Sequence, residues 1–292
     1  MPLPEPPALG TTMLPAGTFD GTVVVVTGGG TGLGKAIAVE FARLGAAVGI
    51  MSRSAEHLEA GVEAVRAVGA RAAHASADIR DPAQVGAAFD ALSAELGTPT
   101  VLVNNAAANF PVPAEDLSPG GWRAVTQIVL DGTFFCSKEL FRRAVDAQQP
   151  GAILNILATQ SFTGGPGMAH TAAAKAGVGN LTKSLAVEWA PHGIRVNCLA
   201  PGLFPHEDMR DDLKALRTEG EDVDARRSPA GRLGQRHELG WAATWLCSPF
   251  ASFVTGHTMV VDGGNWLRRN FVMPEFTPVR DQLSAVLGDR RP

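Results

Sequence analysis

Short apolar runs alternate with longer stretches of helical periodicity along most of this chain. The apolar runs predict strands over residues 22–27, 46–51, 71–76, 99–104, 151–157, 194–199 and 258–262. Helical patterns lie between them, near 32–44, 54–68, 82–96, 119–147, 170–190 and 236–247. Strands that are apolar almost throughout are typical of a parallel sheet covered on both faces. The alternation therefore predicts an α/β fold, a doubly wound parallel sheet in a single domain with helices on both faces.

Three segments fall outside this alternation. Residues 1–20 are rich in Pro and Gly and lack the features of a signal or transit peptide, so we expect a flexible leader, with Met13 as an alternative start. Residues 203–231 are dense in charge, and they predict either a solvated surface helix or a lid over a substrate. Residues 267–292 are expected to wrap the surface or a partner subunit. The patterned domain is then 21–266.

Composition narrows the classes of function. A net charge of −4 argues against a nucleic-acid partner, which would require a basic stripe. No apolar run approaches the roughly 18 residues that a membrane span requires. The three cysteines are widely spaced in apolar runs, which indicates buried core residues rather than a metal site. Such cysteine usage favours a reducing, cytoplasmic location.

A cluster of glycines follows the first predicted strand and opens a helix. Its spacing is Gly-x-x-x-Gly-x-Gly, which differs from the commoner Gly-x-Gly-x-x-Gly fingerprint. Backbone amides at such a turn can approach a pyrophosphate closely, and the helix dipole favours the anion. A tight strand–helix turn alone would also explain the glycines. We predict a dinucleotide site formed here by Thr27, Gly28, Gly30, Thr31, Gly32, Leu33 and Gly34.

The second predicted strand indicates which dinucleotide is bound. An acidic residue at its end would accept from a ribose 2′-hydroxyl and repel a 2′-phosphate, but the chain has Ser52-Arg53 there. An arginine fork suits a phosphate, so NADPH is favoured over NADH. Asp78 is a candidate partner for the adenine amino group. Further cofactor contacts are expected from Ile79, Asn104, Ala106, Pro201 and Gly202.

These motifs together resemble the short-chain dehydrogenase/reductases, from about residue 20 to 266. The resemblance rests on Thr27-Gly28-x-x-x-Gly32-x-Gly34, Asn104-Asn105-Ala106, Lys175, Asn197 with Pro201-Gly202, and Val261-Asp262-Gly263-Gly264. It implies a Rossmann-like subunit, a nicotinamide cofactor and a homotetramer. In most of that family a Ser-Tyr-Lys set acts on a carbonyl or an alcohol, and the tyrosine is the general acid.

The catalytic set is only partly present in this chain, which contains no tyrosine. The resemblance carries the lysine onto Lys175, which is expected to bind the nicotinamide ribose. The tyrosine position is Thr171, one helical turn earlier, and the serine position is Ala158. The helix asparagine falls on Val129. An aliphatic hydroxyl is a far weaker acid than a phenol with a pKa near 10, so Thr171 is poorly suited to carbonyl reduction.

A subset of the family also lacks this tyrosine: the NADPH-dependent 2,4-dienoyl-CoA reductases and the related trans-2-enoyl-CoA reductases. Hydride delivered to a conjugated C=C makes an enolate at the thioester oxygen, which requires hydrogen-bond donors more than a strong acid. The resemblance carries the tyrosine and asparagine that act at that oxygen onto Gln160 and Asp131. Gln160 can donate, whereas Asp131 cannot donate unless it is protonated or bridged by water. Asn109, Phe110 and Phe162 are candidate acyl-CoA contacts.

Several alternatives stay open at this point. One is a carbonyl reductase that uses Lys175, Thr171 and a water molecule, acting for instance on a 3-oxoacyl substrate. Another is a non-catalytic NADPH-binding protein. His170 is either a structural histidine or a titratable group beside Thr171. Arginines such as Arg227 and Arg268 are either solvated surface charges or partners of the CoA phosphates.

Overall fold

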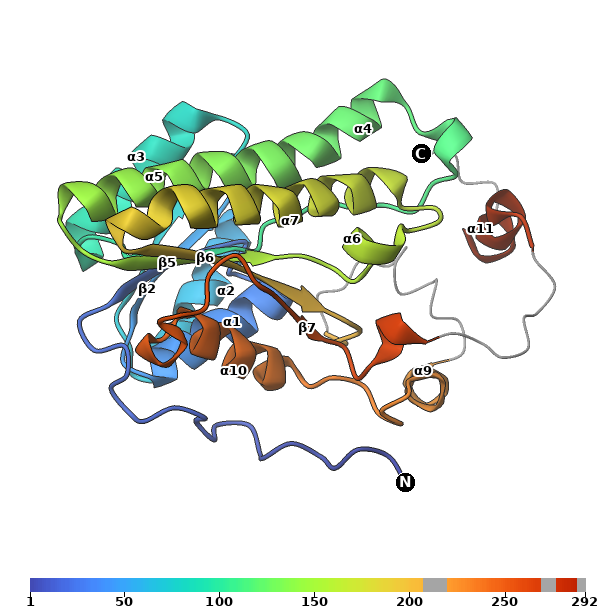
Figure 1. Ribbon diagram of the computed structural model, residues 1–292, viewed down its shortest axis with the longest axis horizontal. Coiled ribbons are helices and arrows are strands. Elements are labelled where there is room, and N and C mark those ends of the chain that lie inside the picture. Colours follow the sequence, from blue (N-terminus) through green and yellow to red (C-terminus); the bar gives the residue numbers. More distant parts are fainter. Residues whose placement is uncertain (207–219, 269–276, 288–292) are drawn as a thin grey trace.

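The computed structural model describes residues 1–206, 220–268 and 277–287 (Figure 1). Seven strands form one parallel sheet in the order β3-β2-β1-β4-β5-β6-β7. All the predicted strands are present, with ends within two residues of those expected. Their bounds are β1 Val23–Thr27, β2 Ala47–Ser52, β3 Ala72–Ser76, β4 Val101–Asn104, β5 Gly151–Ile156, β6 Ile194–Pro201 and β7 Thr258–Val261.

The predicted helices are also present, with one difference in the span expected over 119–147. There α4 and α5 are separated by a π-helical turn at Gln127–Asp131, so the span is interrupted by the kind of bulge that often marks functional sites. Two short helices, α6 and α11, had no counterpart in the predicted pattern, and α9 lies in the charged segment 203–231, where a surface helix was one of two expectations. The helices are α1 Gly32–Arg43, α2 Ala55–Arg66, α3 Pro82–Leu96, α4 Pro119–Thr126, α5 Gly132–Asp146, α6 Gln160–Thr163, α7 Ala169–Trp189, α9 Glu221–Arg227, α10 Arg236–Cys247 and α11 Val279–Leu287.

Helices cover both faces of the sheet, as the apolar strands require. In Figure 1, α3, α5 and α7 lie above the sheet, and α1, α2 and α10 lie below it. The first strand shows why both faces are apolar. Val24 and Val26 belong to the core cluster with α1, α2 and α10, whereas Val23 and Val25 belong to the cluster with α3, α5 and α7. The single-domain, doubly wound fold is therefore confirmed.

The sheet order places a topological switch point at the end of the first strand. Strand β1 lies between β2 and β4, so the chain connections leave it in opposite directions on either side. Ligands in such sheets bind outside the carboxyl ends of the strands at this switch point. Thr27 is in register with Asn104, and Asn104 with Asn155, so three polar residues line up across that edge.

The two terminal segments both contact the domain. Within the leader, Leu14 and Phe19 are buried in the core beside α1 and α10. The Trp241 indole of α10 donates to the carbonyl of Thr11 at 2.9 Å. Within the tail, Arg280 of α11 forms ion pairs with Glu115 at 3.2 Å and Asp116 at 2.9 Å. Of the charged segment 203–231, residues 207–219 lie outside the described part, and the rest includes α9.

Two negative findings apply to the described residues alone. None of their helices has both the length and the apolar character needed to cross a membrane. Nor do those residues bring three His, Cys, Asp or Glu side chains together as a metal site. The three cysteines are buried and unpaired by disulfides.

Candidate active site

The glycine turn after β1 is tied firmly to the end of β4. Thr27 Oγ1 accepts hydrogen bonds from the backbone N–H groups of Asn105 at 3.1 Å and Ala106 at 3.0 Å. In return, the Asn105 amide donates to the carbonyl oxygens of Thr27 and Gly28, each at 3.1 Å. These hydrogen bonds join the end of β1 to the residues that follow β4. They hold the glycine turn in position without a bound ligand.

Glycine is required at several positions of this turn for packing and conformation. Gly28 has φ +64°, and Gly32 has φ +50°. A Cβ at Gly34 would lie 2.4 Å from the Gly28 carbonyl oxygen, and one at Gly30 would lie 1.8 Å from the His57 carbonyl oxygen. Helices α1 and α2 can therefore close on the turn only because these side chains are missing.

The start of α1 is suited to an anion. Its N-cap residue, Thr31, makes no side-chain cap, whereas Ser54 and Asp81 cap the starts of α2 and α3. The first turn of α1 has no acidic residue and is followed by Lys35. The helix dipole at this start, together with the absence of an acidic residue in the first turn, favours a phosphate at this place. The turn therefore fits the pyrophosphate of a dinucleotide.

Strands β2 and β3 end where the adenosine half of such a cofactor would lie. Arg53 directly follows β2, is exposed, and lies 3.8 Å from Asp78 through Nη1 and Oδ2. Asp78 is bound more closely by Arg80, whose guanidinium lowers the pKa of the Asp78 carboxyl. Ile79 is buried against Gly132 at the start of α5. Arg53 is consequently held at the strand end without being the main partner of Asp78.

Lys175 lies on the face of α7 that is packed on the sheet. Its side chain is 6% exposed, and its ammonium donates to the carbonyl oxygen of Ile156, the last residue of β5. Burial lowers the pKa of Lys175 to about 8 from an ordinary value of 10.5. Removal of a cation from water disfavours its charged form, which is why burial lowers this pKa.

Thr171 lies one turn before Lys175 and carries an unsatisfied hydroxyl. Its side chain is buried, and Oγ1 has no hydrogen-bond partner. The neighbouring His170 is fully buried, and neither of its ring nitrogens has a partner. Its ring packs on Phe110, with centroids 4.5 Å apart, and burial lowers the pKa of His170. These buried polar atoms are unusual in a native protein, and a bound ligand or water would satisfy them.

A chain of buried hydrogen bonds lies beneath this region. Asn104 donates from Nδ2 to Ser137 and to Asn155, each at 2.9 Å. The Asn155 amide donates to Thr182 at 2.8 Å, and Thr182 lies 3.0 Å from the thiol of Cys198. The network links β4, β5, β6, α5 and α7. It fixes the relative positions of the strand ends that line the crevice.

The two residues expected at the thioester oxygen differ in their surroundings. Gln160 begins α6 and is half-buried beside Gly165, where a Cβ would lie 3.4 Å from the Gln160 Cβ. Asp131 ends the π-helical turn and is exposed. Ala158, at the family's serine position, is half-buried between β5 and α6. The buried polar groups without a hydrogen-bond partner in this region are the hydroxyls of Thr171 and Ser161 and the ring nitrogens of His170.

The candidate substrate residues surround the same end of the sheet. Asn109 and Phe110 follow β4 and are half-buried, and the Phe110 side chain packs in a small cluster with Val129 and Leu157. Phe162 is 47% exposed, and its ring centroid lies 5.2 Å from that of Trp266. Pro201 is buried at the end of β6, and Gly202 abuts Asp262, leaving 2.4 Å to an added Cβ.

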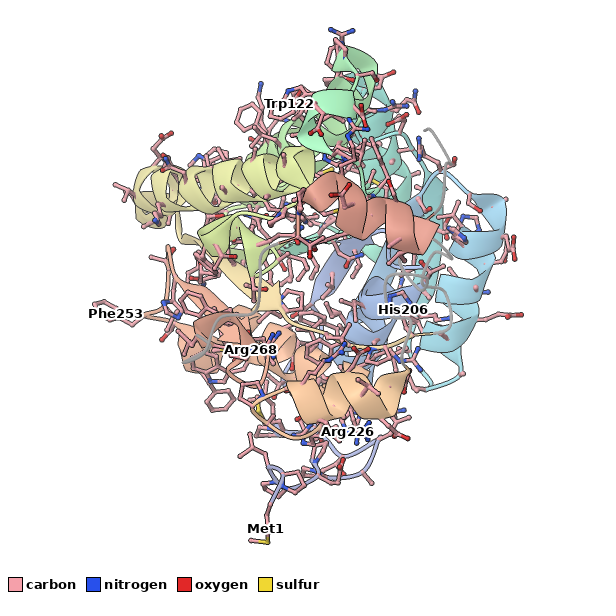
Figure 2. All side chains as sticks on the ribbon, turned by 90° about the vertical axis from the view of Figure 1, so that its right-hand side faces the viewer. Met1, Trp122, His206, Arg226, Phe253 and Arg268 are labelled. Carbon is pink, nitrogen blue, oxygen red and sulfur yellow. The ribbon has the colours of Figure 1, made fainter. Side chains whose placement is uncertain are left out.

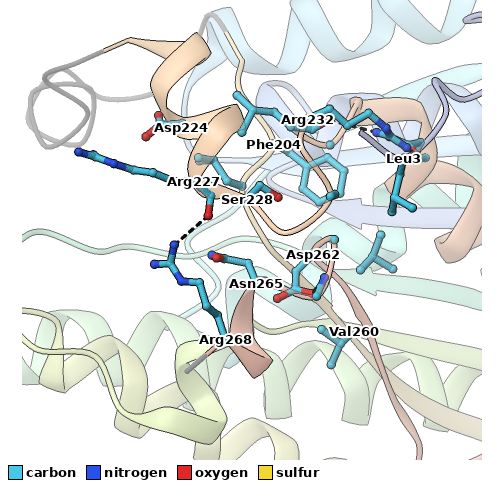
Figure 3. Close-up of a pocket in the computed structure, with 18 residues that line it drawn as sticks. Leu3, Phe204, Asp224, Arg227, Ser228, Arg232, Val260, Asp262, Asn265 and Arg268 are labelled. Carbon is cyan, nitrogen blue, oxygen red and sulfur yellow. Dashed lines mark hydrogen bonds and ion pairs between the residues drawn. The ribbon is translucent and has the colours of Figure 1, made fainter. Parts of the chain in front are cut away.

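A cavity of about 430 Å³ lies beside β7, between α9 and the segment 262–268 (Figure 3). Phe204 and Val260 supply apolar lining, while Arg227 and Arg268 supply cationic side chains. Arg268 donates to the Arg227 carbonyl oxygen at 2.8 Å, so α9 is tied to the turn after β7. The lining also includes Arg232 and three carboxylates, Asp224, Glu238 and Asp262, so the cavity combines an apolar wall with charges of both signs near the carboxyl end of the sheet.

Comparison with known proteins assigns this site to a family. The profile of the family described as enoyl-(acyl carrier protein) reductase matches residues 28–265. A crystal structure of a short chain dehydrogenase from Bacillus anthracis is 39% identical, with a TM-score of 0.77, and covers 86% of this chain and 98% of its own. This chain belongs to the short-chain dehydrogenase/reductase family. The family resemblance read from the sequence is thereby confirmed.

Two further comparisons bear on the site of this short-chain dehydrogenase/reductase. A Bacillus subtilis protein named as a probable 2,4-dienoyl-CoA reductase is 41% identical over 249 residues, which are 84% of this chain and 96% of that protein. A gluconate 5-dehydrogenase from Burkholderia cenocepacia, solved with NADP and tartrate, is 37% identical with a TM-score of 0.78. It covers 86% of this chain and 97% of its own.

Some residues at the site had no signal in the sequence of this short-chain dehydrogenase/reductase. His206 lies against Gly32 although 174 positions separate them, and no local pattern predicts that contact. Trp266 reaches Phe162 by a similarly distant contact. Asn155 and Thr182 are buried polar residues. A polar residue that interrupts an apolar pattern is the signal by which such a buried hydrogen-bonding residue could be found in the sequence.

Proposed function

We propose that this oxidoreductase catalyses NADPH-dependent reduction of a conjugated C=C bond in an unsaturated fatty acyl-CoA, like a 2,4-dienoyl-CoA reductase. One observation carries the proposal: the position one turn before the buried Lys175 holds Thr171, in a chain without any tyrosine. A threonine hydroxyl is a poor general acid for an alkoxide, whereas an enolate requires only donors to its oxygen. The name of the Bacillus subtilis relative supports this substrate class.

The cofactor proposal rests on the glycine turn and on Arg53. NADPH, when bound, supplies a hydride equivalent to the substrate carbon. Thr27, Asn105 and the start of α1 hold the pyrophosphate end, and Arg53 with Ser52 meets the 2′-phosphate. The NADP bound to the related gluconate 5-dehydrogenase supports the same choice. Lys175 binds the hydroxyls of the nicotinamide ribose and adds positive charge to the crevice.

The remaining chemistry falls to donors in the crevice. The Gln160 amide donates to the thioester oxygen and stabilises negative charge that develops there as the conjugated bond is reduced. Thr171 positions the substrate or the ribose through its hydroxyl. A water molecule supplies the proton that completes addition to carbon, so Asp131 acts only as a carboxylate that holds such water. Phe110, Phe162 and Asn109 contact the acyl chain, and Arg227 and Arg268 provide cations for the CoA phosphates.

Assembly and location complete the proposal. The protein forms a homotetramer, as its family resemblance implies. It is located in the cytoplasm, in keeping with three buried thiols that form no disulfide. Analytical ultracentrifugation tests the assembly. A dimer or monomer at micromolar concentration would contradict it without affecting the proposed reaction.

The reaction is tested by following NADPH oxidation with 2,4-dienoyl-CoA, 2-enoyl-CoA and 3-oxoacyl-CoA in parallel. Turnover of either conjugated substrate, with product analysis showing loss of a C=C bond, supports the proposal. Turnover of the 3-oxo compound alone would instead identify a carbonyl reductase. Saturable NADPH binding with no turnover across the panel would identify a non-catalytic nucleotide-binding protein.

A further inference from the structure

His206 lies against the turn that we assign to the cofactor pyrophosphate. A Cβ added at Gly32 would lie 2.9 Å from His206 Cε1, 3.1 Å from Nδ1 and 3.2 Å from Nε2. The imidazole therefore lies directly over the first residue of α1, where Gly32 has φ +50°. Figure 2 looks onto the end of the molecule that carries α9 and α11 and places His206 there. The histidine belongs to the segment that leaves β6, far in sequence from the turn.

We infer that His206 is a ligand of the cofactor diphosphate and makes the affinity for the dinucleotide depend on pH. This rests on the proposed dinucleotide site. The start of α1 offers amide groups and a favourable dipole, but these are fixed partial charges. An imidazolium at Gly32 adds a full, titratable charge to the same place. A charge-assisted hydrogen bond to phosphate is about twice as strong as a neutral one.

The sign of the effect follows from linkage. The diphosphate carries negative charge throughout the neutral range and favours the protonated imidazole, so binding raises the pKa of His206. A histidine that gains an anionic partner on binding contributes most below its unliganded pKa, which is ordinarily about 6.5. The contribution is lost as pH rises through the pKa of the complex. Affinity is therefore highest at mildly acidic pH and falls towards alkaline pH.

The charged and titratable groups near His206 come from α1, α2, α9 and α10. The cavity that Pro205 lines also holds Lys35, Glu40 and Arg43 of α1, Glu221 of α9, and Arg236 and His237 of α10, and His57 of α2 packs behind Gly30. Lysine, arginine and glutamate side chains ordinarily keep their charges between about pH 5.5 and 7.5. His57 is exposed and contacts the turn through its backbone carbonyl. His237 of the same cavity contacts the Pro7 carbonyl oxygen at 3.1 Å, whereas His206 lies against Gly32, so the His206→Gln variant attributes a pH dependence of binding to His206 itself.

The experiment measures dinucleotide affinity by isothermal titration calorimetry, independently of turnover. NADH is the first probe, because the 2′-phosphate of NADPH titrates by itself near pH 6. We expect the dissociation constant of the wild-type protein for NADH to rise about tenfold between about pH 5.5 and pH 7.5. With His206→Gln we expect a change below about twofold. Titrations at pH 7 in buffers of different ionisation enthalpy should show proton uptake for the wild type and none for this variant.

Two further variants make the outcome decisive. His206→Lys keeps a positive charge and is expected to hold the low-pH affinity up to pH 7.5. His257→Gln, at an exposed histidine just before β7, is the matched control and should behave as the wild type. Thermal melts without nucleotide verify that each variant is folded. NADPH should show the same difference between wild type and His206→Gln, added to the titration of its own phosphate.

Three results separate the possible failures. Equal pH slopes and equal proton uptake in wild type and His206→Gln would overturn the role of His206 while leaving the proposed function intact. Binding with the predicted slopes but no reduction of any acyl-CoA would overturn the proposed reaction alone. Failure of the wild type to bind either dinucleotide would overturn both.

Discussion

Lys175 on α7 donates a hydrogen bond from its ammonium to the carbonyl oxygen of Ile156, the last residue of β5. The bond fixes a buried cation at the carboxyl edge of the sheet, where the strand leaves for α6. Holding that cation away from water costs free energy, which is expressed as a lowered pKa for Lys175. The buried charge at this position thus destabilises the folded protein when no ligand is bound.

The first prediction concerns this cost. Lys175→Met removes the buried charge and keeps a similar side-chain length, so we expect the cofactor-free protein to gain about 2 kcal/mol in unfolding free energy at pH 7. The lowered pKa, about 8 against an ordinary 10.5, corresponds to at most about 3 kcal/mol, and the lost hydrogen bond to Ile156 offsets part of it. Urea denaturation measures the difference. Reductase activity should disappear.

The same lysine predicts how stability depends on pH. Between about pH 8 and pH 10.5 the unfolded chain binds more protons at Lys175 than the folded one, so its contribution to stability rises with pH across this window. Below pH 8 both states are charged and the full penalty of burial is present. Lys175→Met should lack this rise. Lys183→Met, at an exposed lysine of the same helix, should retain it, and a rise that persists in Lys175→Met would contradict the assignment.

The second prediction concerns the unsatisfied hydroxyl of Thr171. Thr171→Val keeps the shape and removes the buried Oγ1, so the cofactor-free protein should be as stable or up to about 1 kcal/mol more stable. If the hydroxyl binds substrate or ribose, kcat/KM should fall about tenfold. Thr171→Ser should keep most of the activity. Equal kcat/KM for Thr171→Val and the wild type would show that the hydroxyl only packs the helix.

A third prediction tests the buried network. Thr182→Val removes the acceptor of the Asn155 amide and leaves that amide unsatisfied in the core. We expect a loss of about 2 kcal/mol in unfolding free energy, measured by urea denaturation. Thr126→Val is the matched control, because Thr126 bonds only to backbone carbonyls of its own helix, at Trp122 and Arg123. Its loss should stay below about 0.5 kcal/mol. Equal losses in the two variants would show that the network adds no stability.

The fourth prediction concerns cofactor choice. Arg53→Asp places an acidic side chain at the end of β2, where it accepts from a ribose 2′-hydroxyl and repels a 2′-phosphate. We expect the affinity for NADPH to fall at least tenfold while that for NADH is unchanged or higher, as measured by calorimetry. Arg80→Ala is the control, since Arg80 is the other arginine that pairs with Asp78. An unchanged NADPH preference in Arg53→Asp would place the 2′-phosphate elsewhere.

The strands and the main helices could be predicted from the sequence because continuous apolar runs fit strands buried on both faces, and helical periodicity fits helices that pack one face on the sheet. Val23 to Val26 is apolar at every position, and the structure covers both faces of that strand. The π-helical turn at Gln127–Asp131 could not be predicted, because it preserves the apolar pattern on either side and shifts the register by a single residue. Helix α11 was missed because its nine residues form too short an amphipathic pattern.

The site could be predicted at positions where backbone conformation and close packing allow only glycine. Glycines 28 and 34 fill places that no side chain can enter, so their spacing alone indicates the turn. Contacts that depend on tertiary packing were not predictable. The sequence predicts a cofactor contact for Asn104, but its buried amide is engaged by Ser137 and Asn155. The position of His206 over Gly32 depends on how the chain leaves β6, which no periodicity encodes.

The pairing of Trp266 with Phe162 has an optical consequence. Because the chain has five tryptophans and no tyrosine, its ultraviolet emission comes from indole rings without a phenol background. Trp266 is half-buried beside β7 with its ring 5.2 Å from that of Phe162, so its emission should respond to an acyl chain bound at Phe162, as proposed above. In a variant that retains only this tryptophan, with phenylalanine at the other four positions, substrate binding would change the wavelength and intensity of the fluorescence emission. Because the chain has no tyrosine, no tyrosine emission overlaps the signal of this tryptophan.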